Sequence, residues 1–167
     1  VNDTDVAYWA GYVGPQSSEN VADWYEKRVR AQHGGEAYYF VICALGSSEF
    51  LGTIWLRDFD SRLGGPELSI FVGAKERWNE GVGTDATQAL TDFGFGFLDI
   101  ARIWLTTDKD NQRSQHAFKK AGFVVEGTVR AHHRRRGRLA DSVLMSMLRE
   151  EWEALERPRS WDYQREP

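Results

Sequence analysis

A glycine-containing turn between an apolar strand pattern and a long helical pattern constrains this sequence most. Residues 67–72 form an apolar run typical of a strand, and after residue 84 apolar positions recur at helical spacing. Gly81 and Gly83 stand between them. Glycines let the backbone approach a ligand closely, and the free N–H groups of a helix N-terminus attract phosphate. The turn therefore fits an anion site, and on spacing alone it fits a tight strand–helix connection equally well.

Two familiar phosphate-binding loops do not fit this turn. A Walker-type loop ends in Gly-Lys-Ser/Thr, whereas Gly83 is followed by Thr84 and Asp85 with no lysine. A dinucleotide-binding turn needs three spaced glycines near the first strand of a parallel repeat, and this turn lies mid-chain with two. A phosphate site here must therefore be of another kind.

The remaining pattern predicts a single domain over residues 1–167, with 1–16 hard to interpret and 153–167 as a charged tail. The order of elements indicates a mixed sheet with helices on both faces, an α/β fold. Strands are expected at residues 37–45, 50–56, 67–72, 102–106, 123–131 and 142–148. Helices are expected to end near residue 9 and to span residues 18–32, the turn to about 100, and 111–121.

The composition limits the classes of binding partner and the cellular compartment that we expect for this chain. The net charge of -4 gives no electrostatic reason to expect nucleic acid. No apolar run approaches membrane-spanning length and no signal peptide is recognisable, so no membrane partner is expected. The single Cys43 fits a reducing cytoplasm, and its apolar neighbours indicate a core position. For the oligomeric state, a monomer and a homodimer are both compatible with the sequence.

The turn follows the pattern Gln/Arg-x-x-Gly-x-Gly/Ala except at its first position, where Trp78 stands in place of Gln or Arg. It resembles the acyl-CoA loop of the GNAT N-acetyltransferase superfamily, and the tryptophan is similar to the ribosomal-protein-alanine N-acetyltransferase branch. The second half of the chain extends the resemblance, which covers roughly residues 45–152. The matching positions there are Asn111, Gln112, Arg113, Ser114, Phe118, Ala121, Gly122, Phe123, Glu126, Gly127, Arg130, Gly137, Asp141, Glu151 and Trp152.

The resemblance implies a GNAT fold, whose sheet is mostly antiparallel and whose parallel strands, here 67–72 and 102–106, splay apart. It implies acetyl-CoA as co-substrate in that cleft, no metal, and acetyl transfer to a primary amine. A protein or peptide N-terminal amine is the favoured acceptor. The alternatives are a small amine, such as a polyamine or aminoglycoside, and a CoA-binding module without catalysis. The strand and helix that the family carries ahead of residues 1–30 are not seen, so the first strand is expected to be missing or diverged.

The resemblance also places the cofactor contacts. Backbone N–H groups of the turn would hold the pyrophosphate, and the edge of the splayed strand would pair with the pantetheine arm and supply an oxyanion donor. Asn111 would hydrogen-bond the pantetheine amides, unless it serves as a helix N-cap. Phe118 would form an apolar wall where many relatives carry a tyrosine. The implied cofactor residues are Phe71, Val72, Arg77, Trp78, Asn79, Glu80, Gly81, Val82, Gly83, Thr84, Asn111 and Phe118, with Arg113 as a further phosphate contact.

Acetyl transfer also needs groups that take a proton from the amine and give one to the sulfur. Glu67, at the mouth of the splayed strand, is the expected base, and His133 near the end of a late strand is the reserve. Ser114 is the hydroxyl expected to meet the leaving sulfur, one helical turn before the apolar wall. A merely polar residue in the first helical turn is the alternative for Ser114.

Other polar residues have structural expectations. Asp141 is expected to orient the last hairpin, His116 to lie on a helix surface, and the basic cluster at 134–138 to form a solvated loop. The position of the acidic loop at 58–60 relative to the site would indicate which class of acceptor is bound. An acidic wall in the site would favour a polycation, and an open groove would favour a peptide.

Overall fold

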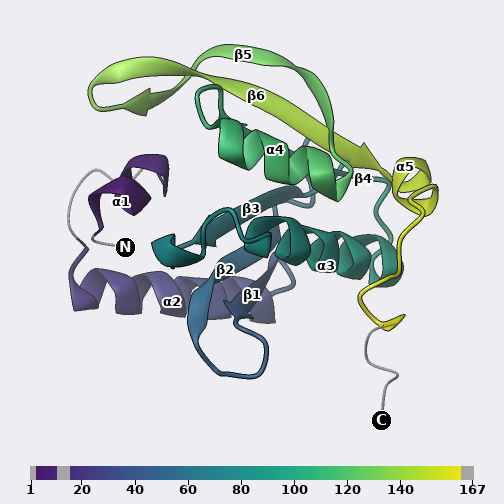
Figure 1. Cartoon of the computed structure of the whole chain (residues 1–167), viewed down its shortest axis with the longest axis horizontal. Coiled ribbons are helices and arrows are strands. Elements are labelled where there is room, and N and C mark those ends of the chain that lie inside the picture. Colours follow the sequence, from purple (N-terminus) through teal and green to yellow (C-terminus); the bar gives the residue numbers. More distant parts are fainter. Residues whose placement is uncertain (1–2, 11–15, 163–167) are drawn as a thin grey trace.

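The computed structural model describes residues 3–10 and 16–162, which form a six-stranded sheet with helices on both faces (Figure 1). The strands are β1 Ala37–Cys43, β2 Phe50–Arg57, β3 Glu67–Val72, β4 Arg102–Asp108, β5 Val124–Arg135 and β6 Arg138–Leu148. The helices are α1 Thr4–Ala10, α2 Ser18–His33, α3 Val82–Phe97, α4 Gln112–Ala121 and α5 Arg149–Glu153, with a 3₁₀ turn η1 at Lys75–Arg77. The strand order is β1-β2-β3-β4-β6-β5, and within the described residues only β3 and β4 pair in parallel. The predicted mixed, mostly antiparallel α/β sheet is confirmed.

The parallel strands β3 and β4 pair at one end and separate at the other. Their ladder contains one pair of opposite residues, Glu67 and Trp104. At this junction the Trp104 backbone N–H donates to the Pro66 carbonyl at 3.1 Å, and the Trp104 indole N–H donates to the Gly65 carbonyl at 2.8 Å. The predicted splayed pair is therefore confirmed, and it opens at the C-terminal ends of both strands.

Helix α3 lies close against the sheet at Gly94. A Cβ atom at this position would lie 3.0 Å from Ile103 and 3.2 Å from Leu56, so the missing side chain permits the approach. The apolar positions that recur at helical spacing include Leu90 and Phe97 and predict one buried face. Leu90 is buried as predicted, whereas Phe97 is exposed. The buried arc is broader than one stripe because α4 and α5 also cover α3. Its buried residues are Ala86, Thr87, Leu90, Thr91, Asp92, Gly94 and Phe95.

Helix α2 covers the opposite face of the sheet. It begins after the N-cap Ser17, whose hydroxyl accepts the Asn20 N–H at 3.1 Å. The Arg28 guanidinium of α2 lies 5.4 Å from the ring of Tyr39 and 5.9 Å from that of Trp55. These two side chains are cross-strand neighbours on β1 and β2, and they share the face turned away from α3.

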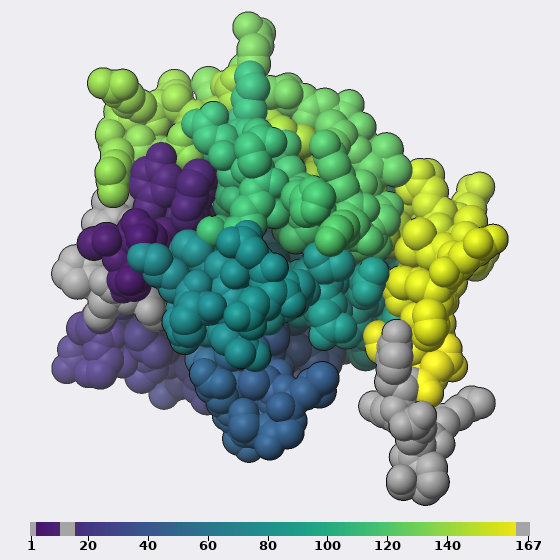
Figure 2. Space-filling view, viewed as in Figure 1, coloured from purple at the N-terminus to yellow at the C-terminus, as the bar shows by residue number. Residues whose placement is uncertain are grey.

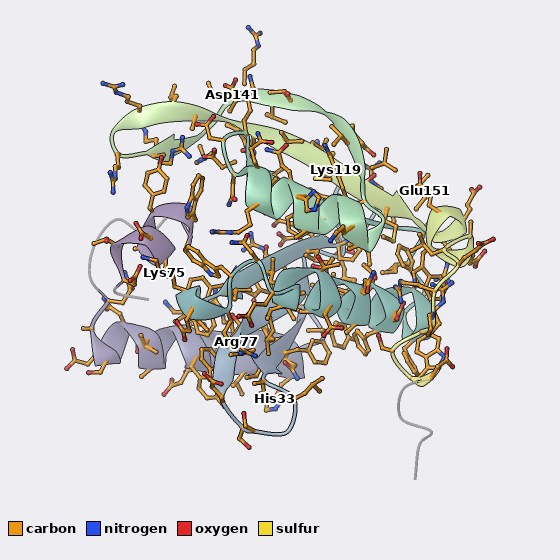
Figure 3. All side chains as sticks on the ribbon, in the orientation of Figure 1. His33, Lys75, Arg77, Lys119, Asp141 and Glu151 are labelled. Atoms are coloured by element: carbon orange, nitrogen blue, oxygen red, sulfur yellow. The ribbon has the colours of Figure 1, made fainter. Side chains whose placement is uncertain are left out.

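Helix α1 bridges two distant parts of the chain. Asp5 pairs with Lys75 of η1, which is labelled in Figure 3. The Tyr8 ring lies 4.7 Å from the Arg136 guanidinium at the tip of the β5–β6 hairpin. Val6 is buried between these contacts. Figure 2 shows α1 filling the space between the hairpin tip and the start of α3. Helix α1 therefore forms one wall of the region between the hairpin tip and the start of α3.

The β5–β6 hairpin is longer than the sequence pattern predicts. Its strands run to Arg135 and restart at Arg138, and the turn residues Arg136 and Gly137 have φ values of 46° and 76°. Two positive φ values are typical of the tight turns that match the twist of a hairpin. Residues 134–138 are mostly exposed, as predicted, but they form a hairpin tip with a two-residue turn rather than a loop.

The segment after β6 packs back on α3. The Asp92 carboxylate is fully buried and accepts hydrogen bonds from the Trp152 indole, the Arg157 guanidinium and both the N–H and hydroxyl of Ser160, all between 2.7 and 2.9 Å. Residues 153–162 of the predicted charged tail are therefore anchored to the core helix. The rest of that tail and residues 1–2 and 11–15 lie outside the described residues.

Cys43 is exposed, so the prediction of a core position is wrong. The register of β1 against β2 shifts between Ile42 and Cys43, which removes the last residue of β1 from the regular alternation of side chains. Within the described part of the chain, no helix is both long and apolar enough to span a membrane.

Candidate active site

The open end of the β3–β4 pair leads into a cavity of about 1350 Å³. Its walls come from α1, β3, the loop that follows β3, β4, the helix α4 and the hairpin tip. The separation of two strands leaves backbone edges exposed to this space, which a ligand can pair with. The predicted site residues that line it are Phe71, Val72, Arg77, Trp78, Asn79, Gly81, Val82, Gly83, Thr84, Asn111, Ser114, Phe118 and His133.

The loop between β3 and α3 carries a run of backbone N–H groups without acceptors. Gly81 has a φ of 90° and Asn79 a φ of 69°, and α3 begins directly after them. None of the described residues accepts a hydrogen bond from the N–H groups of residues 79–84, whereas the Asp85 N–H donates to the Gly81 carbonyl at 3.0 Å. Free N–H groups at a helix N-terminus form an anion site. The loop has the geometry that the predicted phosphate contact requires.

Trp78 binds this loop to the end of β3, and its ring packs against the guanidinium of Arg113. Its indole N–H donates to the Val72 carbonyl at 3.0 Å, and the Arg113 guanidinium of α4 lies 3.7 Å from its ring. Burial lowers the pKa of Arg113, and no carboxylate of the described residues pairs with it. A partly buried cation beside free N–H groups strengthens an anion site.

Arg77 and Glu80 pair with each other within the loop. The Arg77 Nε atom lies 3.3 Å from the Glu80 carboxylate. Arg77 lines the cavity, whereas the Glu80 side chain does not. The predicted cofactor contact of Glu80 is therefore reduced to its backbone N–H.

Helix α4 brings three predicted residues to the opening. The Asn111 side-chain oxygen accepts the Ser114 N–H at 3.1 Å and so caps α4, which leaves its amide N–H groups for a ligand. Thr107 of β4 donates to the Ser114 hydroxyl oxygen at 2.9 Å, and Ser114 keeps its own proton for another acceptor. Phe118 is 5% exposed and packs 5.9 Å from the ring of Phe123, yet it also lines the cavity.

Glu67 lies at the closed end of the β3–β4 pair. It is the residue paired with Trp104, and its carboxylate accepts two hydrogen bonds from Arg57 at 2.7 and 2.9 Å. Its side chain does not line the cavity. The predicted placement at the mouth is wrong because β3 runs toward the opening, which puts its first residue farthest from it.

His133 lines the cavity and has two polar partners. Its Nε2 atom lies 3.0 Å from the Asp108 carboxylate, and its Nδ1 atom lies 3.1 Å from the Ser142 hydroxyl oxygen. Arg135 donates to the same carboxylate oxygen at 2.6 Å. Asp108 is therefore shared by a histidine and an arginine, and it holds the His133 ring in one orientation.

Three candidates could not be found from the sequence: Asp108, His132 and Ser142, which all line the cavity. Asp108 ends β4 two residues beyond the expected strand, and Ser142 is its partner in the β4–β6 register. The sequence feature that could have indicated them is the pair of adjacent histidines at 132 and 133, followed by a serine on the next strand, β6. Among the described residues, no group of three or more His, Cys, Asp or Glu side chains is arranged to hold a metal ion.

The cavity is cationic although the whole chain carries a net charge of -4. Asp108 is the only carboxylate among its described lining residues. The lining cations are Arg77, Arg113, Lys120, Arg134, Arg135 and Arg136. The acidic loop with Asp58 and Asp60 lines a separate cavity with Glu36, at the closed end of the sheet. The acidic wall that would mark a polycation site is not found in the described part of the main cavity.

Comparison with known families gives one match over most of the chain. A family profile described as an acetyltransferase (GNAT) domain matches residues 1–124. Similar curated proteins include uncharacterized N-acetyltransferase p20 of Bacillus licheniformis, 30% identical over 118 residues, and spermidine N(1)-acetyltransferase of Escherichia coli K12, 28% identical over 109 residues. These matches cover 71% and 65% of this chain. They cover 66% and 55% of the two relatives, which is less than two thirds of their length.

Solved structures share the fold at low sequence identity. A spermidine N-acetyltransferase of Vibrio cholerae, in complex with CoA and spermine, has a TM-score of 0.78 at 20% identity and covers 91% of this chain and 87% of its own. A ribosomal-protein-S5-alanine acetyltransferase of Vibrio fischeri has a TM-score of 0.76 at 20% identity and covers 94% and 85%. At this identity the likeness establishes the fold and leaves the acceptor open.

Proposed function

This chain belongs to the GNAT acetyltransferase family, and from that membership we propose that it moves an acetyl group from acetyl-CoA to a primary amine. The observation that carries the proposal is the run of free N–H groups at residues 79–84, next to the open end of β3 and β4. Acetyl-CoA supplies the activated acetyl thioester. The chain must hold it, stabilise the developing oxyanion and move protons.

The residues around the cavity fit the parts of acetyl-CoA that they would contact. The N–H groups of residues 79–84 and the Arg113 guanidinium supply donors for the pyrophosphate. A Cβ atom at Gly81 would meet nothing within 4 Å, so there is room above the loop. On β3, Phe71 and Val72 are the proposed contacts of the pantetheine arm. Val72 would act through its N–H, because its carbonyl accepts the Trp78 indole.

We favour a peptide N-terminal amine as acceptor. The hairpin tip and α1 form one side of the cavity, where Arg135 and Arg136 lie 4.9 and 4.7 Å from the Tyr8 ring. A peptide N-terminus brings one positive charge, which it loses before attack. An acidic residue beside it would meet Arg136 favourably, whereas Arg135 is already paired with Asp108 and Asp110. This choice also agrees with the resemblance to ribosomal-protein-alanine N-acetyltransferases.

A polyamine is the second candidate, and it rests on the similarity to the E. coli spermidine N(1)-acetyltransferase. A polyamine carries several positive charges, and the described lining offers one carboxylate already bound by Arg135. Repulsion between like charges therefore opposes this candidate.

Turnover with a panel of amines tests both the activity and the acceptor. The full chain is mixed with acetyl-CoA and one amine at a time, and the released thiol is measured. The panel holds a peptide beginning Ala-Glu, its Ala-Lys counterpart, spermidine and an aminoglycoside. We expect kcat/KM to be highest for the Ala-Glu peptide and lowest for spermidine. Spermidine as best acceptor would reverse the choice, and binding of acetyl-CoA without turnover of any amine would indicate a CoA-binding module.

Glu67→Gln is expected to change kcat by no more than about threefold. The carboxylate lies outside the cavity and is bound by Arg57, so the substitution weakens an ion pair without touching the site. Steady-state kinetics with the best acceptor measures the effect, and thermal unfolding measures the loss of the pair. A fall of about 10²-fold at unchanged acetyl-CoA affinity would instead make Glu67 the base, acting through water.

Phe118→Tyr is expected to keep acetyl-CoA affinity within about twofold and to lower Tm by only about 2–4 °C. The ring packs on Phe123 and also lines the cavity, so the added hydroxyl can face the opening. Calorimetric titration and thermal unfolding measure these quantities. Phe123→Tyr serves as the control, because that ring is buried and does not line the cavity. Equal destabilisation of the two variants would mean that the Phe118 ring edge is enclosed by the core.

A further inference from the structure

Two adjacent histidines of β5 reach the same hydroxyl group. The Nδ1 atoms of His132 and His133 lie 2.9 and 3.1 Å from the Ser142 hydroxyl oxygen. Neighbouring residues of a regular strand point to opposite faces of the sheet. Here the register of β5 against β6 shifts between Val129 and His133, and Ala131 has a φ of 52°. The strand is therefore bulged, and the bulge turns both rings toward Ser142.

Asp141 holds this bulge in place. One of its carboxylate oxygens accepts the Ala131 N–H at 3.0 Å, and the other lies 3.3 Å from the Lys109 ammonium group. The hydrogen bond from Ala131, with the help of Lys109, lowers the pKa of Asp141. Its position on the hairpin is visible in Figure 3. The prediction that Asp141 orients the last hairpin is therefore confirmed.

The hydrogen bonds continue from Ser142 to a carboxylate. His133 Nε2 lies 3.0 Å from Asp108, whose side chain is 10% exposed, and Ser142 is 2% exposed. His132, at the other end, is exposed and lines the cavity. We define His132, Ser142, His133 and Asp108, in that order, as the histidine chain. It runs from the exposed His132 ring to the mostly buried carboxylate of Asp108.

Counting protons assigns both histidine tautomers. Arg135 and His133 both bind the Asp108 carboxylate, so His133 must carry its proton on Nε2. A neutral His133 then has a bare Nδ1 atom, which accepts the Ser142 hydroxyl proton. A serine hydroxyl has one proton, so His132 must donate its own Nδ1 proton to Ser142. The Nε2 atom of His132 is left as a bare nitrogen.

We propose that the histidine chain is a proton relay, which takes a proton from the acceptor amine at His132 Nε2. This proposal rests on the proposed acetyl transfer. As the amine nitrogen bonds to the acetyl carbon and the carbon–sulfur bond breaks, one proton leaves the nitrogen. The relay takes that proton on His132 Nε2, passes the Nδ1 proton to Ser142, and passes the Ser142 proton to His133 Nδ1. His132 is again neutral, and the single added charge rests on His133 beside Asp108. The Ser114 hydroxyl, which Thr107 leaves free to donate, meets the departing thiolate.

The tautomers can be observed without any substrate. Nitrogen-15 chemical shifts of the histidine rings in the full chain, at a pH where they are neutral, report which nitrogen carries the proton. We expect the Nδ1–H form for His132 and the Nε2–H form for His133. Ser142→Ala should return His132 to the Nε2–H form that free imidazole side chains prefer and leave His133 unchanged. An Nε2–H form of His132 in the wild-type protein would overturn the relay.

Kinetics provides the second measurement. His132→Gln and Ser142→Ala should each lower kcat by about 10²-fold and leave the affinity for acetyl-CoA within about twofold. The control is His33→Gln, at the C-terminal end of α2 and outside the cavity lining (Figure 3). Unchanged kcat in both relay variants, or an acetyl group found on Ser142 by mass spectrometry, would overturn the proposal. A wild-type chain without turnover would count against the proposed function, while the tautomers would still decide whether the histidine chain exists as assigned.

Discussion

Gly81→Val is expected to weaken acetyl-CoA binding by about 10³-fold and to cost no more stability than Gly46→Val. Gly81 and Gly46 have φ values of 90° and 76°, and a Cβ atom at either position would meet nothing within 4 Å. Both substitutions therefore carry similar backbone strain, on the order of 1–2 kcal/mol. Only Gly81 lies within the run of free N–H groups, since Gly46 lies in the β1–β2 turn outside the cavity lining.

The size of the effect follows from the hydrogen bonds that would be lost. A valine at Gly81 either fills the open space above the loop or turns the backbone away from a positive φ. Both outcomes remove N–H groups from the pyrophosphate. Losing two charge-assisted bonds of about 2 kcal/mol each corresponds to about 10³-fold in affinity. Calorimetric titration of acetyl-CoA and urea unfolding of both variants separate binding from stability. Equal affinities of the two variants would place the pyrophosphate elsewhere.

Asp92→Ala is expected to lower the free energy of unfolding by about 3–5 kcal/mol. The carboxylate is fully buried, and its loss leaves the guanidinium of Arg157 and the indole of Trp152 without their acceptor. Asp85→Ala is the control, because Asp85 is exposed in the first turn of the same helix. Its loss removes a favourable helix-dipole interaction of at most about 1 kcal/mol. Urea unfolding of both variants measures the difference, and equal losses would show that the clamp adds no stability.

The same carboxylate predicts a dependence on pH. Desolvation alone would raise the pKa of Asp92, but hydrogen bonds from Arg157, Trp152 and Ser160 outweigh it and lower the pKa below its usual value. A lowered pKa in the folded state contributes stability that is complete above the unfolded pKa of about 3.9 and is lost as pH falls through the folded value. The stability difference between wild type and Asp92→Asn should therefore be constant above about pH 5 and shrink below about pH 4. A difference that grows in acid would contradict the lowered pKa.

Local patterns were enough to predict the parts of the site that depend on consecutive residues. The turn with Gly81, the strand before it and the capped helix at Asn111 each follow from short-range rules, and the structure has all three. The splayed strand pair came with the family resemblance. The sequence pattern also predicted the strand over residues 102–106, although this strand runs on to Asp108.

These short-range rules could not predict how residues far apart in the sequence lie relative to one another. The position of Glu67 relative to the opening depends on which end of β3 pairs with β4, and a single strand pattern does not contain that information. The joint role of His132 and His133 depends on a bulge, whereas regular alternation places adjacent side chains on opposite faces. Phe97 stays exposed although the Trp161 ring of the tail lies 5.7 Å from it, and the periodicity of α3 alone could not show how far the tail covers each position.

The two halves of the cavity are built on different kinds of structure. The side around the N–H loop rests on α3 and α4, whose Leu90, Phe118 and Ala121 belong to the main hydrophobic core. The opposite side is a short helix and a hairpin tip, joined through Tyr8 and its two arginine neighbours. Inherited changes in these two peripheral pieces can redirect such an enzyme to a new acceptor while the core that folds it stays the same. Because the pieces touch, they would have to evolve, or be grafted, as one exchangeable unit.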